Sequence, residues 1–316
     1  MLMTIPELRS ALEREGYICE EEVAVTIYLA LTLNKPLLVE GAPGVGKTEI
    51  AKVLAAIFNT ELIRLQCYEG LDENKALYEW NYQRQLIKIQ ISRDNAQGEQ
   101  LERNLFSEEY LLERPLLRAI RASEKKVLLI DEVDKVEAEF EAFLFEVLSD
   151  FQVSIPELGT VYATHIPIVV LTSNGERELS DGLKRRCIYL YIDFPSIEKE
   201  TCILQVKVPG AGVKITEQIA NAANYIRANL NLRKKPSIAE TIDWARALSA
   251  LDVQSLDSNS VNKTLNVLLK NKDDQELLRN DTGIDNLVQI TQTATTAYGS
   301  GCSCHANHVH KNHKHS

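Results

Sequence analysis

The sequence of 316 residues contains no apolar run of about 18 or more residues, the length that a helix needs to cross a membrane. Its first residues, Met1 to Glu7, also lack the basic and then apolar layout of a secretion signal. These two absences predict a cytoplasmic protein that does not act in a membrane.

Positive charge is scarce, with 35 Lys and Arg against 45 Asp and Glu, so the formal net charge is −10. Proteins that bind nucleic acid neutralise its phosphates with clustered Lys and Arg. The composition therefore argues against a nucleic-acid partner. An apolar content of 45% is ordinary for a globular protein, and the length predicts about two domains.

Cysteine is also infrequent, and its six positions fall into two groups. The isolated cysteines are typical of small buried side chains in a reducing compartment, and they are Cys19, Cys67, Cys187 and Cys202. The other two lie beside five histidines near the end of the chain, where thiolate and imidazole groups could bind zinc, nickel or copper. The candidate ligands are Cys302, Cys304, His305, His308 and His310. The alternative is a weakly ordered tail that binds metal only adventitiously, because the spacings fit no defined zinc finger.

The most informative segment is a complete phosphate-binding loop, Gly41-Ala42-Pro43-Gly44-Val45-Gly46-Lys47-Thr48. Its glycines let backbone N–H groups point at phosphates, Lys47 can reach the outer phosphates, and the Thr48 hydroxyl can bind Mg²⁺. An apolar strand-like run precedes the loop and a helical pattern follows it, so the helix N-terminus faces the anion. The sequence therefore predicts a protein that binds a nucleoside triphosphate.

Two more apolar runs end in polar side chains. The run from Val127 to Ile130 is followed by Asp131, which could hold Mg²⁺ together with Thr48, and by Glu132, which could polarise a water molecule. The alternative is a pair of solvated acids in a turn. Because a kinase has no need of an acid that activates water, the pair favours hydrolysis.

Asn174 follows another buried run, Ile166 to Ser173, and its amide could orient the attacking water. Taken alone, an Asn after a strand is usually a turn residue. Arg185 and Arg186 come eleven and twelve residues later. A guanidinium supplied by a neighbouring subunit would stabilise the transferring phosphoryl group, and the alternative is a surface salt bridge.

One further pattern is rejected. Asn271-Lys272-Asp273-Asp274 matches the N-K-x-D pattern with which GTPases read guanine, but it follows a helical run in the second domain. Adenine is therefore the favoured base.

The chain divides by its pattern of elements. Strand-like runs alternate with helical patterns up to Pro195, which predicts an α/β fold with a parallel sheet covered by helices on both faces. Only helical patterns follow. The predicted domains are a nucleotide-binding core with an N-terminal helical segment over 1–195, a helical domain over 196–280, and a weakly ordered end over 281–316.

The ordered set of phosphate loop, Asp131-Glu132 strand end, Asn174 strand end and Arg-Arg-Cys resembles an AAA+ ATPase. Within that superfamily, several segments are similar to the MoxR group, particularly its CoxD-like branch. These segments are 36–49, 65–72, 78–82 and 149–157.

This resemblance implies a five-stranded P-loop core with a small all-α lid, assembly into homo-hexameric rings, and ATP-driven remodelling of client proteins during maturation or metal-cofactor insertion. A partner with a von Willebrand factor A domain is implied as well. By position, the resemblance makes Asn174 the first sensor and Arg186 the intersubunit finger, with Arg185 as the alternative. It also implies a hairpin over Phe151 to Thr164.

The sequence departs from the AAA+ pattern in the lid, where no arginine falls at the position of the usual second sensor and Lys235 is the candidate substitute. Two other functions stay open. One is a nucleotide-dependent binding switch with negligible hydrolysis, and the other is a nucleic-acid motor or loader on the same scaffold.

Overall fold

The computed structural model describes residues 3–92 and 105–297. The chain divides into two compact units, Met1–Asp193 and Phe194–Ser316, and each has a hydrophobic core of its own. In the described parts of the chain, no helix has both the length and the apolar character needed to cross a membrane.

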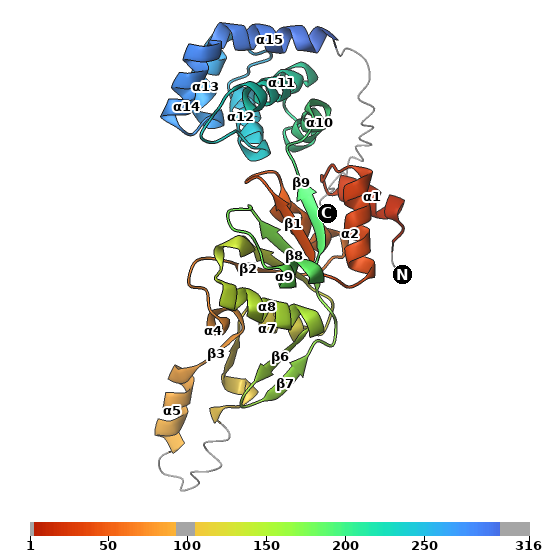
Figure 1. The fold of residues 1–316 in the computed structure, drawn as a ribbon, viewed down its shortest axis with the longest axis vertical. Coiled ribbons are helices and arrows are strands. Elements are labelled where there is room, and N and C mark those ends of the chain that lie inside the picture. The colour runs from red at the N-terminus through yellow and green to blue at the C-terminus, as the bar shows by residue number, and fades with distance from the viewer. Residues whose placement is uncertain (1–2, 93–104, 298–316) are drawn as a thin grey trace, which may run out of the picture. The chain divides into compact units, whose positions relative to one another are not determined.

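A five-stranded parallel sheet forms the centre of the first unit, in the order β2-β5-β8-β1-β9 (Figure 1). Its central strands β5 and β8 are buried along their whole length, as expected of parallel strands that are covered on both faces. The bounds of β5 and β8 lie within two residues of the predicted runs Val127 to Ile130 and Ile166 to Ser173. The strands are β1 Leu37–Gly41, β2 Leu62–Gln66, β5 Val127–Asp131, β8 Ile168–Ser173 and β9 Ile188–Ile192.

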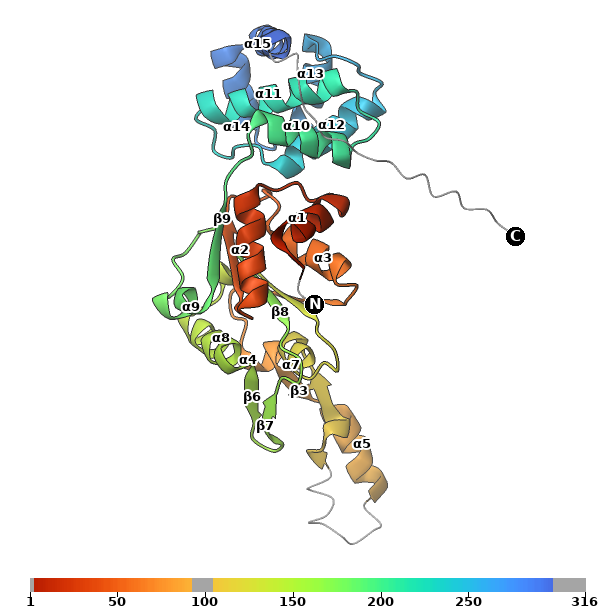
Figure 2. The ribbon, with the colours of Figure 1, turned by 90° about the vertical axis from the view of Figure 1, so that its right-hand side faces the viewer.

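Helices cover both faces of this sheet (Figures 1 and 2). On one face, α7 (Pro115–Ile120) and α8 (Ala138–Asp150) share a core with alternate side chains of β2, β5 and β8. The other face carries α3 (Lys47–Ile57), which contacts β1, β2, β5 and β8. Two further helices, α1 (Ile5–Arg14) and α2 (Glu21–Thr32), pack near α3 and β9 respectively. The predicted fold class is confirmed.

Two antiparallel hairpins extend the first unit. The pair of β6 (Gln152–Ile155) and β7 (Gly159–Tyr162) is the hairpin that the resemblance implied. The pair of β3 (Tyr78–Trp80) and β4 (Leu111–Glu113) was not predicted, because strands of three residues carry little periodicity. Short helices flank this second pair, namely α4 (Glu73–Ala76), α5 (Tyr82–Ser92) and η1 (Glu108–Tyr110).

The second unit is helical in its described residues. Its core surrounds Trp244, which is fully buried and donates a hydrogen bond from Nε1 to Thr264 Oγ1 at 2.7 Å. The elements are α10 Ile197–Lys207, α11 Val213–Asn229, α12 Ile238–Ala250, α13 Ser258–Leu268, α14 Lys272–Leu277, the π-helical turn η3 Leu278–Thr282, and α15 Ile284–Ala297.

The order of this unit extends further than the sequence predicted. Residues from 281 onwards were expected to be weakly ordered, yet α15 places Leu287, Val288 and Thr291 in the interior. These residues recur at helical spacing, and their apolar signal is diluted by the many polar residues around them. The predicted metal ligands from Cys302 to His310 lie outside the described residues.

Candidate nucleotide-binding site

The phosphate-binding loop connects the end of β1 at Gly41 to the start of α3 at Lys47. Gly44 (φ +76°) and Gly46 (φ +98°) adopt left-handed backbone conformations that side chains rarely tolerate. A Cβ atom on Gly41 would lie 2.2 Å from the carbonyl oxygen of Ile192, so only glycine fits there. The loop therefore needs the glycines that the pattern supplies.

Lys47 lies inside this loop and is only 6% exposed. Its Nζ donates hydrogen bonds to the carbonyl oxygens of Gly41 at 2.7 Å and Ala42 at 2.9 Å, and to Oδ1 of Asn174 at 2.8 Å. The loop lysine and the predicted sensor amide are therefore in direct contact, although 127 residues separate them.

Burial lowers the pKa of Lys47, because removing an ammonium group from water disfavours its charged form. The negative charges of four carboxylates oppose this effect and raise the pKa of Lys47. From the strongest to the weakest, they are Asp134, Asp131, Glu132 and Glu40. Several carboxylates therefore surround the Lys47 ammonium group, and such a cluster can bind an added cation.

Asp131 ends β5 and is 4% exposed. Its Oδ1 accepts hydrogen bonds from the hydroxyls of Thr48 at 3.2 Å and Thr172 at 2.5 Å. Its Oδ2 forms an ion pair with Arg64 on β2 at 2.5 Å. The structure therefore brings together the two residues predicted to bind Mg²⁺, and it adds a guanidinium that the sequence analysis missed.

Glu132 follows in a left-handed conformation with φ of +58°, which is unusual for a side chain of this size. Its N–H donates to the Thr172 hydroxyl at 2.9 Å. Its carboxylate accepts hydrogen bonds from Gln66 Nε2 at 2.9 Å and from Lys135 Nζ at 2.7 Å. The hydrogen bond with Glu132 raises the pKa of Lys135. The predicted water-polarising carboxylate is thus held by two neighbours in this structure.

The two predicted arginines lie on α9, Asp181–Arg186, away from the contacts of Lys47. Arg186 donates from Nε to Ser149 Oγ at 3.0 Å, and its guanidinium carbon lies 4.6 Å above the centre of the Phe145 ring. Arg185 is exposed, and in the part of the chain that the structure describes it makes no ion pair or hydrogen bond. Both arginines are accessible at the surface of the first unit.

Lys235 and the rejected N-K-x-D pattern both lie in the second unit. Lys235, the candidate second sensor, is exposed in the connection before α12. The rejected N-K-x-D pattern has a structural role, since Asn271 caps α14 and Asp274 accepts hydrogen bonds from the N–H groups of Arg233 and Lys234.

Oxygen atoms dominate the candidate magnesium site, and Mg²⁺ prefers oxygen ligands. Thr48 and Asp131 therefore fit this ion, and no cluster of three or more His, Cys, Asp or Glu side chains with metal-binding geometry occurs elsewhere in residues 3–92 and 105–297. The metal site predicted for the tail stays a prediction.

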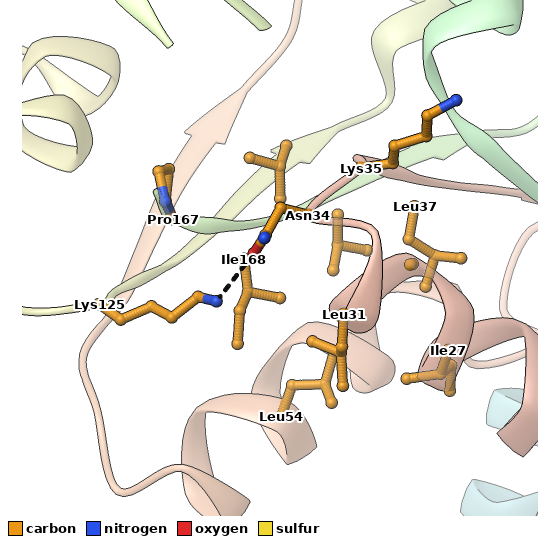
Figure 3. Close-up of a pocket in the computed structure, with 12 residues that line it drawn as sticks. Ile27, Leu31, Asn34, Lys35, Leu37, Leu54, Lys125, Pro167 and Ile168 are labelled. Atoms are coloured by element: carbon orange, nitrogen blue, oxygen red, sulfur yellow. Dashed lines mark hydrogen bonds between the residues drawn. The ribbon is translucent and has the colours of Figure 1, made fainter. Parts of the chain in front are cut away.

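A separate apolar pocket lies at the other end of the sheet (Figure 3). It is lined by Ile27, Leu54 and the first residues of β1 and β8, and Lys125 donates to Asn34 Oδ1 at 3.2 Å beside it. Ligands of parallel α/β sheets bind at the carboxyl ends of the strands. This pocket is at the amino ends, so it is distinct from the candidate site.

We next compared the sequence with known protein families. Residues 36–187 match the family described as AAA domain (dynein-related subfamily). The matched range begins one residue before β1 and ends immediately after Arg186, so it contains the phosphate loop, Asp131, Glu132 and the predicted sensor Asn174. The narrower assignment to the MoxR group stays a prediction.

Similar proteins extend over most of the chain. An uncharacterized protein of Staphylococcus haemolyticus (strain JCSC1435) is 25% identical over 280 residues, covering 84% of this chain and 97% of that protein. An uncharacterized protein of Staphylococcus aureus (strain USA300) is 26% identical over 229 residues, covering 68% and 76%. A solved structure of the Thermotoga maritima RuvB Holliday junction branch migration motor is 21% identical with a TM-score of 0.47, covering 85% of this chain and 73% of that one.

Proposed function

We propose that this chain binds ATP with Mg²⁺, hydrolyses it to ADP and phosphate, and uses the cycle to remodel client proteins. In this proposal it is a cytoplasmic MoxR-type AAA+ protein of the CoxD-like branch that assembles into homo-hexameric rings. A partner with a von Willebrand factor A domain and a client enzyme under maturation or metal-cofactor insertion complete the proposal. No disulfide forms between the four buried cysteines of the described residues, Cys19, Cys67, Cys187 and Cys202, which is compatible with a reducing compartment.

The observation that carries the proposal is the meeting of three strand ends at one edge of the sheet. Thr48 Oγ1 lies 3.2 Å from Asp131 Oδ1, and Lys47 Nζ lies 2.8 Å from Asn174 Oδ1. Thr48 and Asp131 would hold Mg²⁺, which supplies charge neutralisation on the phosphates when it is bound. The loop N–H groups and Lys47 would bind the phosphates, and Glu132 would polarise the attacking water.

The orientation of Arg186 on α9 supports the proposed ring assembly. Arg186 is exposed, yet its guanidinium is oriented by Phe145 and Ser149 of the same chain. A guanidinium that is fixed before it meets a neighbouring subunit loses less conformational entropy on binding a phosphate than a free one. We therefore assign Arg186 as the finger and keep Arg185 as the alternative.

ATP turnover of substituted full-length proteins tests this function. We expect Lys47→Ala to lose nucleotide binding, and we expect Glu132→Gln to bind ATP but to turn it over about 100-fold more slowly. Arg186→Ala should lose turnover only under conditions in which the protein assembles. Lys52→Ala, an exposed lysine on the same helix, is the control. Parental turnover in Glu132→Gln would refute the catalytic assignment.

One observation favours a second candidate function, the nucleotide-dependent binding switch. The Oε2 atom of Glu132 accepts hydrogen bonds from both Lys135 and Gln66, and a carboxylate paired with a cation is a weaker base toward water. A switch would bind ATP tightly without turnover at any protein concentration, whereas the ATPase would show turnover that rises with assembly or with a client. Stimulation of turnover by DNA with strong salt dependence would instead support a nucleic-acid motor.

A further inference from the structure

A buried carboxylate beside the candidate site has no role in the functions considered above. Asp134 belongs to the short 3₁₀ helix η2, Val133–Lys135, which follows Glu132. The residue is 4% exposed, and burial of a charged carboxylate is costly unless it is paired or hydrogen-bonded. Its surroundings indicate what that function is.

The Asp134 carboxylate holds the backbone at the end of β8. Its Oδ2 accepts hydrogen bonds from the N–H groups of Asn174 and Glu176, both at 3.0 Å. These two N–H groups belong to the connection that leaves the sheet after Ser173, where strand pairing no longer fixes the chain. One carboxylate oxygen therefore determines the backbone position of the residue whose side chain contacts Lys47.

The second oxygen of this carboxylate is unusual. Within the described residues, Oδ1 of Asp134 is buried and has no hydrogen-bond partner. Among the groups that favour the charged form of Lys47, Asp134 is the strongest, ahead of Asp131 and Glu132. The negative charge of the Asp134 carboxylate thus acts on the Lys47 ammonium group, which also donates a hydrogen bond to Asn174.

We propose that Asp134 is a positioning residue of the nucleotide site, which fixes Asn174 through its backbone and so orients the amide that contacts Lys47. The inference rests on the proposed ATPase function for its effect on turnover. Its structural part, the anchoring of Asn174 and Glu176, is independent of any reaction. A neighbouring buried carboxylate, Glu141, accepts a hydrogen bond from the N–H of Ser180 at 2.9 Å in the same connection and forms an ion pair with Arg177.

Two substitutions separate the hydrogen bonds that Asp134 accepts from its negative charge. In Asp134→Asn the amide oxygen can still accept both N–H groups, but the negative charge is lost. In Asp134→Ala the hydrogen bonds and the negative charge are both lost. Glu141→Gln is the matched control, because it perturbs a buried carboxylate of α8 that binds the same connection and is not among the charges acting on Lys47.

The first measurement is amide hydrogen exchange of the full-length proteins without nucleotide. We expect exchange at Asn174 and Glu176 to accelerate about tenfold or more in Asp134→Ala, and to remain near the parental rate in Asp134→Asn and Glu141→Gln. Equal exchange in the alanine and asparagine variants, or parental exchange in both, would overturn the anchoring role whether or not the protein hydrolyses ATP.

The second measurement is turnover of Mg²⁺-ATP. We expect Asp134→Ala to lose about 100-fold in kcat, because displacement of a positioning group by about 1 Å costs this much. Asp134→Asn should recover most of that loss, because its amide oxygen can still accept the N–H groups of Asn174 and Glu176. Parental turnover in Asp134→Ala would refute the effect on the reaction, whereas absence of turnover in the parent itself would refute the proposed function.

Discussion

The hydroxyl of Thr48 lies 3.2 Å from the carboxylate of Asp131, although 83 residues separate them in the chain. Thr48 is in the first turn of the helix after β1, and Asp131 is the last residue of β5. Strand β8 lies between these two strands in the sheet, and its Thr172 donates to the same carboxylate oxygen. Three elements therefore orient one oxygen-rich site.

This arrangement predicts the effect of Asp131→Asn on metal dependence. An amide is a weaker ligand for Mg²⁺ than a carboxylate, so we expect the Mg²⁺ concentration for half-maximal ATP binding to rise about 100-fold. The measurement is titration of a fluorescent ATP analogue with Mg²⁺ in full-length protein. Asp150→Asn, on the exposed end of α8, is the control. An unchanged Mg²⁺ requirement in Asp131→Asn would contradict the assignment.

The Arg64 guanidinium would compete with a bound metal ion for the same carboxylate, because it pairs with Oδ2 of Asp131. We therefore expect Arg64→Gln to tighten Mg²⁺-dependent ATP binding by about twofold to fivefold at low salt. Arg64 is 53% exposed, so salt should screen the pair and the gain should shrink as ionic strength rises. Arg118→Gln removes a similarly exposed, paired arginine and is the matched control. Weaker Mg²⁺ binding in Arg64→Gln would count against competition.

Lys47 should give the site an alkaline limit. Burial lowers its pKa, so the neutral amine forms at a lower pH than in an ordinary lysine. ATP affinity should therefore fall as pH rises through that lowered pKa, and the profile of Lys52→Ala should match the parent because Lys52 is exposed.

The stability of the nucleotide-free protein should show the opposite trend in the same pH window. Between the lowered folded pKa and the ordinary unfolded pKa of Lys47, the unfolded chain binds more protons than the folded one. The free energy of unfolding then rises with pH, and Lys47→Met should abolish this contribution. Denaturant titrations of both proteins across about pH 7 to 10 measure it. Identical pH dependence in the two proteins would exclude a shifted Lys47.

The free energy of unfolding of the second unit should depend strongly on one buried ion pair. Arg227 and Glu200 are 5% and 0% exposed, and their two hydrogen bonds measure 2.6 and 2.8 Å. Arg227 also donates to Pro236 O and Thr241 Oγ1, which orders the start of α12. Removing one partner leaves an unpaired buried charge, so we expect Glu200→Leu to cost about 3 to 5 kcal/mol in free energy of unfolding.

Tryptophan fluorescence can measure this effect in one unit alone. The chain has two tryptophans, Trp80 in the first unit and Trp244 in the second. In a Trp80→Phe background the denaturation curve of the full-length protein reports the surroundings of Trp244. Combining Glu200→Leu with Arg227→Met should recover much of the loss, because no unpaired charge remains. A double variant as unstable as the sum of the single variants would show that the pair does not act as a unit.

The sequence predicted the parts of the site that depend on local order. Strands β1, β5 and β8 were recognised because they are continuous apolar runs, and Lys47, Thr48, Asp131 and Asn174 follow or precede these runs at fixed distances. Their contacts then follow from parallel strands that end at one edge of the sheet.

The remaining side chains of the site could not be recognised in this way. Asp134, Thr172, Arg64 and Lys135 gain their roles from burial or from partners on other elements, and isolated acids or hydroxyls are ordinary at such positions. One signal was present for Asp134, since it falls two residues after Glu132 and immediately before a basic residue. Helix α15 was missed for a related reason, as its buried face is short and interrupted by threonines.

The carbonyl of Ile192 against which Gly41 packs has a mechanical consequence. Ile192 ends β9, and the first unit gives way to the second only one residue later, after Asp193. The chain that carries the helical unit therefore departs from the floor of the phosphate loop. A ligand that moved Gly41 against Ile192 would therefore be coupled to a ligand that moved β9, and by linkage each would change the affinity for the other by the same factor.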